Sequence, residues 1–344
     1  MRGIERLIVT GGAGFIGSTF VRWMLDRHPD LQVTVLDKLT YAGNLENLAD
    51  VATDPRYRFV HGDIADAPLV ARVADEADAI VNFAAESHVD RSIEAPDAFV
   101  QTAIVGTHVL LEAARRSRHT VFLQVSTDEV YGDVSTGSST EESRLAPRSP
   151  YAASKAGADL LVLAYATTYG LPVVITRSSN NYGPYQHPEK IIPLFVTNAL
   201  AGEPLPLYGD GLQVRDWLYV LDNCAAIETV LLEGATGQVY NVGAGTEITN
   251  LELTRAILAE GGAPASLVRL VEDRPGHDRR YSVDSARIRA LGWRPQRDFI
   301  DALGATVAWY RDHPGWWEPL KSGAYREYYR RMYEDRLTAG SRLE

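Results

Sequence analysis

The sequence predicts an α/β fold in which a doubly wound, mostly parallel sheet is joined to a smaller C-terminal α/β domain. Two observations predict it. Short apolar runs typical of buried strands alternate along the chain with segments whose apolar residues recur at helical spacing. Polar groups follow several of these strands at their carboxyl ends, which is the ligand side of such a sheet. We expect the sheet domain to span residues 1–175, the second domain to occupy mainly residues 176–322 with the chain crossing back, and residues 323–344 to form a charged tail.

Composition excludes several classes of protein. The chain has 344 residues and a net charge of −11, so its bulk charge does not attract nucleic acid or an acidic membrane. Its single cysteine, Cys224, allows no intramolecular disulfide and no cysteine-rich metal site, and we expect inert packing there. We expect no metal. The start of the sequence shows no targeting segment and no stretch approaches the length of a membrane span, so the cytoplasm is the expected location.

The first element is a strand over Glu5–Thr10, followed by a glycine loop and a helical pattern. Strand, glycine loop and helix in this order are typical of the Rossmann dinucleotide site. Gly11 allows the tight turn, Gly14 lets backbone N–H groups approach a pyrophosphate, and Gly17 lets helix and strand pack closely. The positive end of the helix then faces the phosphates.

The second strand, Val33–Leu36, ends at Asp37, about 20 residues beyond the loop, where an acid can accept hydrogen bonds from the adenosine ribose. Such an acid repels a 2′-phosphate and favours NAD over NADP. Lys38 beside it is either a cofactor contact or a solvated loop lysine. The third strand, Tyr57–Val60, leads to Asp63, which suits an adenine amino group or the N-cap of a helix equally well.

A fourth strand, Ala79–Ala84, is followed by a polar segment in which His88 is either a ligand contact or a structural histidine. A long helical pattern covers Asp97–Arg116, and the fifth strand, Thr120–Ser126, delivers three polar residues, Thr127, Asp128 and Glu129. The loop Gly132–Pro150 is long for a structureless connection, so we expect a mobile surface segment.

Later elements keep alternating. Strands are expected at Val173–Thr176, Pro204–Asp210, Val214–Val220 and Gln238–Val242, and helices at Ile192–Leu200, Leu221–Leu232, Leu251–Glu260, Arg287–Leu291 and Asp301–Tyr310. The charged stretch Tyr325–Glu344 predicts a surface helix with a frayed end.

Tyr151 and Lys155 lie four residues apart and therefore share one helix face. A tyrosine acting as a base near neutral pH needs its pKa lowered by about 3 units from about 10. A nearby ammonium and the positive nicotinamide ring of NAD⁺ supply that direction of shift. Hydride transfer needs one acid–base group, so the adjacent acids Asp128 and Glu129 indicate a further step, the elimination of water. Two close carboxyls disfavour double ionisation, which leaves one proton available.

The loop Gly11–Gly17 with Tyr151 and Lys155 resembles the extended short-chain dehydrogenase/reductase family of nucleotide-sugar enzymes. The triplet Thr127–Glu129 narrows the resemblance to its sugar-dehydrating members, and further motifs agree: Glu86–Ser92, Asn180–Gln186 and Leu207–Gly211. The resemblance covers Leu7 to about Trp317. It implies NAD as a retained cofactor, dTDP-glucose as substrate and a 4-keto-6-deoxy sugar nucleotide plus water as products.

The resemblance also implies roles. Tyr151 takes the proton of the glucose 4-hydroxyl while Thr127 hydrogen-bonds that oxygen; Glu129 removes the C5 proton, and Asp128 protonates the departing 6-hydroxyl. Two alternatives stay open, a nucleotide-sugar 4-epimerase and a non-enzymatic NAD-sensing protein. The acid pair argues against the first, and the intact set of Thr127, Tyr151 and Lys155 argues against the second.

Expected contacts follow residue by residue from the same resemblance. For the cofactor they are Gly11, Gly14, Phe15, Ile16, Gly17, Asp37, Lys38, Thr40, Asp63, Ile64, Ala84, Ser126, Tyr151, Lys155 and Asn180. For the substrate they are Ser87, Thr127, Asn180, Glu189, Lys190, Ile191, Pro206, Tyr208, Arg215, Asn250, Arg274, His277 and Tyr281. Arg215 and Arg274 match the diphosphate ligands, a role that suits the bidentate grip of arginine.

Two further points come from the resemblance. Relatives usually carry Thr-Asn where this chain has Thr102-Ala103, which puts one hydrogen bond near the cofactor in doubt. A homodimer is implied, in which the helices Asp97–Arg116 and Ser154–Tyr169 of each subunit form a four-helix interface. The resemblance does not say which pathway uses the product.

Overall fold

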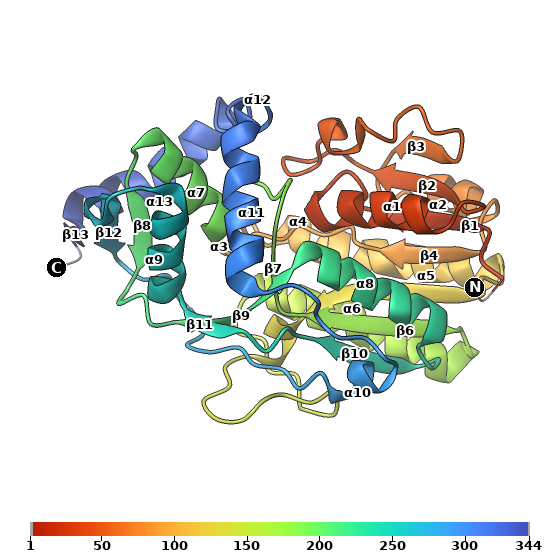
Figure 1. Ribbon diagram of the computed structural model, residues 1–344. Coiled ribbons are helices and arrows are strands. Elements are labelled where there is room, and N and C mark those ends of the chain that lie inside the picture. The colour runs from red at the N-terminus through yellow and green to blue at the C-terminus, as the bar shows by residue number, and fades with distance from the viewer. Residues whose placement is uncertain (1–2, 343–344) are drawn as a thin grey trace.

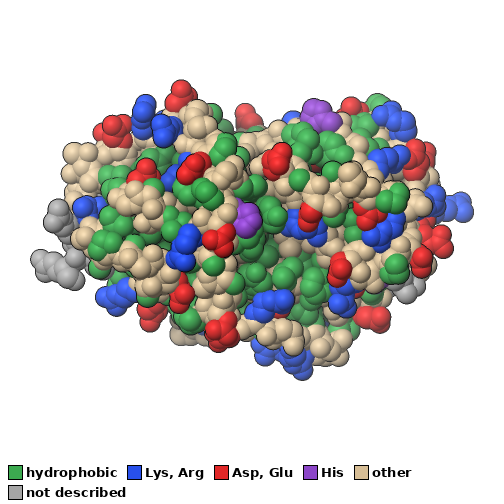
Figure 2. Space-filling model, turned by 45° about the horizontal axis from the view of Figure 1, so that its top comes forward, with side chains coloured by type: hydrophobic (Ala, Val, Ile, Leu, Met, Phe, Trp, Pro, Cys, Tyr) green, Lys and Arg blue, Asp and Glu red, His purple; other side chains and the backbone are tan. Residues whose placement is uncertain are grey.

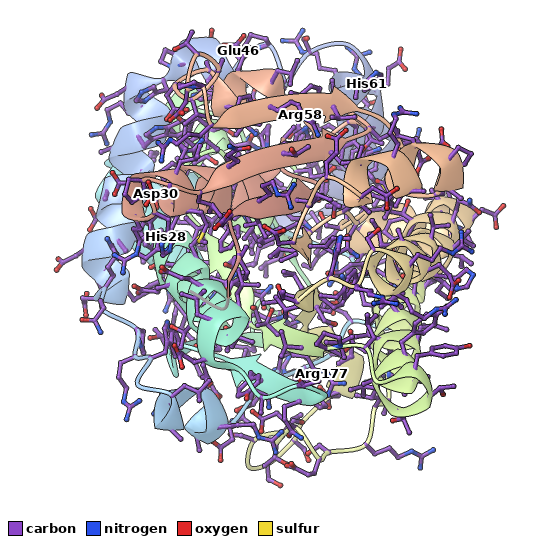
Figure 3. All side chains as sticks on the ribbon, turned by 90° about the vertical axis from the view of Figure 1, so that its right-hand side faces the viewer. His28, Asp30, Glu46, Arg58, His61 and Arg177 are labelled. Carbon is purple, nitrogen blue, oxygen red and sulfur yellow. The ribbon has the colours of Figure 1, made fainter. Side chains whose placement is uncertain are left out.

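The computed structural model describes residues 3–342 and shows two lobes (Figure 1). Among the described residues, the larger lobe holds one seven-stranded, fully parallel sheet in the order β10-β6-β5-β4-β1-β2-β3. Its strands are β1 (Arg6–Thr10), β2 (Gln32–Asp37), β3 (Tyr57–His61), β4 (Ala79–Asn82), β5 (Val121–Thr127), β6 (Val173–Ser178) and β10 (Gln238–Val242). Figure 3 looks from the side of this lobe, with Arg58 and His61 marking edge strand β3 and Arg177 marking β6 near the opposite edge.

Helices cover both faces of the sheet because alternate strand side chains point to opposite sides. Leu7 and Val9 of β1 join the apolar cluster under α1 (Phe15–Arg27) and α8 (Val220–Glu233). Ile8 joins the cluster under α2 (Ala67–Ala74), α5 (Thr107–Arg116) and α6 (Pro150–Tyr169). The expected doubly wound Rossmann sheet is therefore confirmed.

The long helical pattern expected over Asp97–Arg116 is formed by three consecutive segments. These are α4 (Asp97–Val100), a π-helical segment (Gln101–Gly106) and α5. The π-helical segment contains Thr102 and Ala103, and the short α3 (Val89–Glu94) precedes α4.

The smaller lobe contains two three-stranded sheets among the residues that the structure describes. One has the order β11-β9-β7 and the other β13-β12-β8. The strands are β7 (Asn180–Tyr182), β8 (Leu205–Tyr208), β9 (Val214–Tyr219), β11 (Glu247–Thr249), β12 (Val268–Val271) and β13 (Ser341–Arg342). Its helices are α7 (Ile191–Ala201), α9 (Asn250–Gly261), α11 (Phe299–Asp312), α12 (Pro314–Trp317) and α13 (Ala324–Ala339). Short 3-10 turns lie at Leu45–Leu48, Asp128–Tyr131 and Ala265–Leu267.

The chain crosses between the lobes, since α8, β10 and α10 (Ala286–Ala290) return to the large sheet after the first strands of the small lobe. The expected boundary at residues 175–176 falls inside β6, and the division into residue ranges stays a prediction. Cys224 is buried among apolar side chains, as expected. Among the described residues, no helix is long and apolar enough to cross a membrane.

One expectation needs correction. The loop Gly132–Pro150 is not a loose surface segment, because Val134 N and Ser139 N donate to carbonyls of the segment Arg280–Ser282 and Glu141 accepts from Asn241 N of β10. The C-terminal helix α13 is the surface helix that was expected, and it also buries one face. Tyr325, Tyr328 and Tyr333 are buried, because its tyrosine face packs against the rest of the molecule. The expected frayed end at residues 343–344 lies outside the described residues.

Candidate active site

A first pocket runs along the carboxyl ends of the large sheet's strands. Every residue that was expected to contact the cofactor lines it, except Asn180. The pocket also includes Ser87, which was expected at the substrate. Residues that were not among the expected cofactor contacts complete the lining: Leu36, Ala42, Gly43, Gly62, Phe83, Ala85, Glu86, Thr102, Val125, Gln186 and His187.

The glycine loop has the shape that a pyrophosphate requires. Gly11 has a φ of +65°, and a Cβ there would lie 2.7 Å from the backbone nitrogen of Ala84. A Cβ on Gly17 would lie 2.3 Å from the carbonyl oxygen of Gly11. Helix α1 starts after Gly14, which has no side chain to cap the first N–H groups, so those groups remain available to an anion. These residues fit a dinucleotide cofactor.

Asp37 closes the adenosine end of this pocket at the end of β2. Its carboxylate accepts hydrogen bonds from the backbone N–H of Ala13 at 2.9 Å and of Leu39 at 2.8 Å. Lys38 pairs with Asp63 at 2.6 Å, so its charge is already balanced and does not invite a 2′-phosphate. Asp63 accepts from Ala65 N, whereas Asp66 is the N-cap of α2. The N-cap alternative for Asp63 is therefore excluded.

The acid pair follows β5 in a 3-10 turn. The Thr127 hydroxyl accepts from Glu129 N at 3.2 Å and contacts Asp128 Oδ1 at 3.2 Å, which holds the turn. Burial, Glu129 and Asp216 raise the pKa of Asp128 well above its usual range. Among the described residues, Asp128 Oδ2 is buried without a hydrogen-bond partner.

Glu129 faces a different charge environment from its neighbour. Burial raises its pKa, but Arg274, Lys190 and Arg215 oppose the rise by stabilising the carboxylate. The pKa values of both carboxyls are raised, and the three cations stabilise the carboxylate of Glu129 in particular, so Asp128 is the more strongly protonated of the two. They titrate as a coupled pair.

Tyr151 and Lys155 lie in the first turns of α6, whose Ser149 N-cap accepts from Ala152 N. Tyr151 is hydrogen-bonded to Thr127, and burial raises its pKa above the usual range. Burial lowers the pKa of Lys155 to about 8, opposed by Asp159, and its amine donates to the Val125 carbonyl at 2.6 Å. The residues around Tyr151 therefore do not lower its pKa as a base requires, because burial and the nearby carboxyl of Glu129 raise it. The positive nicotinamide of a bound NAD⁺ would shift this pKa downward.

A buried network supports this lysine. Asp159, one turn further along α6, accepts hydrogen bonds from Ser126 Oγ at 3.0 Å and from Arg177 Nε at 2.9 Å. Arg177 of β6 also donates to the Tyr131 hydroxyl at 2.9 Å. The network ties α6 to β5 and β6, and so fixes Lys155 relative to the acid pair.

A second pocket lies against the small lobe, and Glu189 and Lys190 line both pockets. Figure 2 shows the surface hollowed between the lobes. Glu129 reaches this second pocket, together with ten residues expected at the substrate: Asn180, Glu189, Lys190, Ile191, Pro206, Tyr208, Arg215, Asn250, Arg274 and His277. Thr127 and Tyr281 lie behind this lining, and Tyr281 stacks under the Arg215 guanidinium at 4.2 Å.

Several residues of the second pocket were not among the expected substrate contacts. They are His88, Val89, Asp90, Leu194, Phe195, Leu207, Trp217 and Tyr333. His88 was left undecided; it is buried, contacts the Tyr328 hydroxyl at 3.3 Å and also lines this pocket. Tyr333 belongs to α13. Its signal was the recurrence of Tyr325, Tyr329 and Tyr333 at helical spacing, which indicates a buried helix face.

Comparisons with known proteins agree with this geometry. The family model described as GDP-mannose 4,6 dehydratase matches residues 8–306. The chain is 57% identical over 322 residues to a dTDP-glucose 4,6-dehydratase of Streptomyces niveus, covering 92% of this chain and 96% of the relative.

Solved structures agree as well. A dTDP-glucose 4,6-dehydratase from Streptomyces venezuelae, solved with NAD and a second ligand, is 59% identical with a TM-score of 0.90, covering 92% of this chain and 100% of that one. The enzyme from Bacillus anthracis, solved with NAD, is 48% identical with a TM-score of 0.87 over the same shares. The chain therefore belongs to the dTDP-glucose 4,6-dehydratases, within the extended short-chain dehydrogenase/reductases.

Proposed function

We propose that the chain converts dTDP-glucose to dTDP-4-keto-6-deoxyglucose and water, as an NAD-dependent hydro-lyase. The observation that carries this is the adjacent pair Asp128 and Glu129, in which Asp128 is buried with a pKa well above its usual range and Glu129 lines the second pocket among three cations. An enzyme that only oxidises or epimerises at C4 has no step that uses two additional carboxyls.

The first step is oxidation at C4. Tyr151 takes the proton of the 4-hydroxyl, and Thr127, to which it is hydrogen-bonded, orients that oxygen. Lys155, mostly charged at neutral pH because its pKa is about 8, stabilises the phenolate. The residues of the first pocket would hold NAD, which when bound would supply the hydride acceptor for C4 and the hydride donor for C6.

The second step is elimination across C5 and C6. The C4 ketone acidifies the C5 proton, which Glu129 removes. Asp128, kept protonated by burial, gives its proton to the departing 6-hydroxyl. Hydride return to C6 and reprotonation of C5 by Glu129 complete the turnover, and the redox balance is zero.

The cations of the second pocket suit the substrate diphosphate. Arg215, Arg274 and Lys190 gather there in a chain whose net charge is −11, and they equal in number the acids of the same lining, which are Asp90, Glu129 and Glu189. Asn180 and Asn250 add polar groups from neighbouring elements. Ile191, Pro206, Tyr208 and His277 offer apolar and aromatic surface for the thymine ring.

The rival functions use less of the site. A 4-epimerase has no step that uses Asp128 and Glu129. An NAD-sensing protein also has no step that uses Tyr151, Thr127 and Lys155. Burying idle carboxyls is costly, because each must be desolvated without return in binding or catalysis.

We also propose a homodimer through the helices Asp97–Arg116 and Ser154–Tyr169. Val100 (47% exposed) and Leu160 (58% exposed) project apolar surface from these two neighbouring segments. Two copies of such a face would bury it in a four-helix interface. The cytoplasmic location stays a prediction.

The test is incubation of the purified protein with dTDP-glucose, without added reductant, followed by mass spectrometry. The proposal expects loss of one water with no net reduced cofactor. An unchanged mass with inverted configuration at C4 would show an epimerase, and no reaction would favour the sensor.

A further inference from the structure

One nitrogen of the Arg274 guanidinium is hydrogen-bonded, and another has no partner among the described residues. Its Nη1 donates to Asp90 Oδ1 at 3.1 Å, while its Nε is buried with no partner among the described residues. Both residues line the second pocket. An arginine whose guanidinium is fixed by one hydrogen bond and keeps another N–H donor free is well placed to bind an anionic ligand. The inference below rests on the proposed role of Arg274 at the substrate diphosphate.

Asp90 is an unusual neighbour for an anion site. It is 3% exposed, lies in the first turn of α3, and receives a second hydrogen bond from the Tyr208 hydroxyl at 3.1 Å. Although burial opposes ionisation, Arg274 and His88 hold the pKa of Asp90 below its usual value. A carboxylate here repels a diphosphate through space, so its presence needs a compensating role.

The C-terminal helix supports this arrangement from the other side. Arg336 Nη1 donates to the Tyr208 hydroxyl at 3.1 Å, and the Tyr333 hydroxyl lies 3.4 Å from it. Tyr333 is buried and lines the pocket itself. Helix α13 lies beyond residue 306, where the family model ends.

We propose that Asp90 is a positioning residue that orients Arg274 toward the substrate diphosphate, and that Tyr208, braced by Tyr333 and Arg336 of α13, holds Asp90 in place. Without Asp90, the Arg274 guanidinium is free to turn toward Glu129, whose carboxylate it already attracts. It would then contact the catalytic base instead of the substrate. The C-terminal helix thereby becomes part of the substrate site.

For Asp90→Asn, the proposal predicts a change in dTDP affinity that is opposite in sign to the change expected from charge alone. Asp90→Asn removes a negative charge close to the diphosphate, so electrostatics alone would tighten dTDP binding. Loss of the positioning contact instead weakens it. We expect dTDP affinity to fall roughly tenfold, about the worth of one charge-assisted hydrogen bond.

The experiment is calorimetric titration of NAD-loaded protein with dTDP and, separately, with thymidine, which has no phosphate. Asp90→Asn should weaken dTDP but leave thymidine binding unchanged, and should raise KM for dTDP-glucose more than it lowers kcat. The double variant with Arg274→Gln should bind dTDP no more weakly than Arg274→Gln alone, because the two residues act as one unit. NAD content should stay at the wild-type level.

Three variants complete the design. Tyr208→Phe removes the second hydrogen bond to Asp90 and should also weaken dTDP, which answers the question if Asp90→Asn fails to fold. Tyr333→Phe should give a smaller loss in the same direction. Arg331→Gln lies on the same helix, in a surface ion pair with Glu94, and is the matched control that should change nothing.

The outcomes separate the two hypotheses. If Arg274→Gln weakens dTDP while Asp90→Asn and Tyr208→Phe bind it as tightly as wild type or tighter, the positioning role is wrong and the proposed function stands. If Arg274→Gln itself leaves dTDP binding unchanged, the diphosphate assignment fails, and this inference fails with it.

Discussion

Replacing Glu129 with glutamine should stop the reaction between its two halves. Glutamine has the shape of glutamate but cannot take the C5 proton. C4 oxidation depends on Tyr151 and Thr127, which the substitution leaves in place. The variant should therefore oxidise its substrate once and then stall, with the cofactor in its reduced form.

The expected loss of rate follows from the role of Glu129 as a general base. Loss of a general base typically costs about 10²–10⁴-fold in rate, or about 2.7–5.4 kcal/mol of transition-state stabilisation. A value toward the upper end is expected, because Glu129 is held among Arg274, Lys190 and Arg215, and no carboxylate other than the protonated Asp128 follows β5 in this turn.

The assay is single-turnover absorbance of the reduced nicotinamide, together with solvent-deuterium exchange at C5. Glu129→Gln should show a persistent absorbance rise, no exchange at C5 and no water loss. Water loss within tenfold of the wild-type rate would refute the assignment of Glu129 as the base.

Four further outcomes are expected. Asp128→Asn should retain deuterium exchange at C5 but lose water release. Because the folded-state pKa of Asp128 is raised, wild-type stability falls relative to the variant as pH rises from about 4 to that folded-state pKa, and the difference in melting temperature should be constant above it. Gly17→Ala should leave purified protein without bound NAD, since the new Cβ would lie 2.3 Å from Gly11 O, and ultraviolet absorbance of the denatured protein reads the content. The wild-type kcat should fall along an acid limb that lies above pH 4.3, because the pKa of Glu129 is raised from the usual value of about 4.3, and a kcat that stays constant from pH 7 down to pH 4.3 would contradict this. Leu160→Asp should give a monomer by light scattering, and a wild-type monomer at the same concentration would contradict the dimer.

The sheet could be predicted because its signals are local. Each buried strand is a short apolar run, and the glycine loop is recognisable at the junction of β1 and α1. The strand expected over Gln238–Val242 matches β10 at both ends, although its place beside β6 is a long-range fact. The tethering of the loop Gly132–Pro150 depends on distant partners, and so its sequence suggested a mobile segment.

The residues of the candidate site also divide into those that local sequence could predict and those that depend on long-range contacts. The cofactor pocket follows strand ends in order, so its residues could be found by position along the chain. The direction in which the pKa of Tyr151 shifts could not be predicted, because it depends on how completely the phenol is buried in the fold. Asp90 and Tyr333 were missed because their partners, Arg274 and Tyr208, come from elements far away in sequence.

The central claim is that one bound cofactor carries hydride from C4 to C6 of the same sugar. The most direct measurement uses dTDP-glucose deuterated at C4, with mass spectrometry and NMR of the product. The account predicts that the product keeps the deuterium and carries it on the C6 methyl group. Deuterium lost to solvent, or retained at C4, would contradict it.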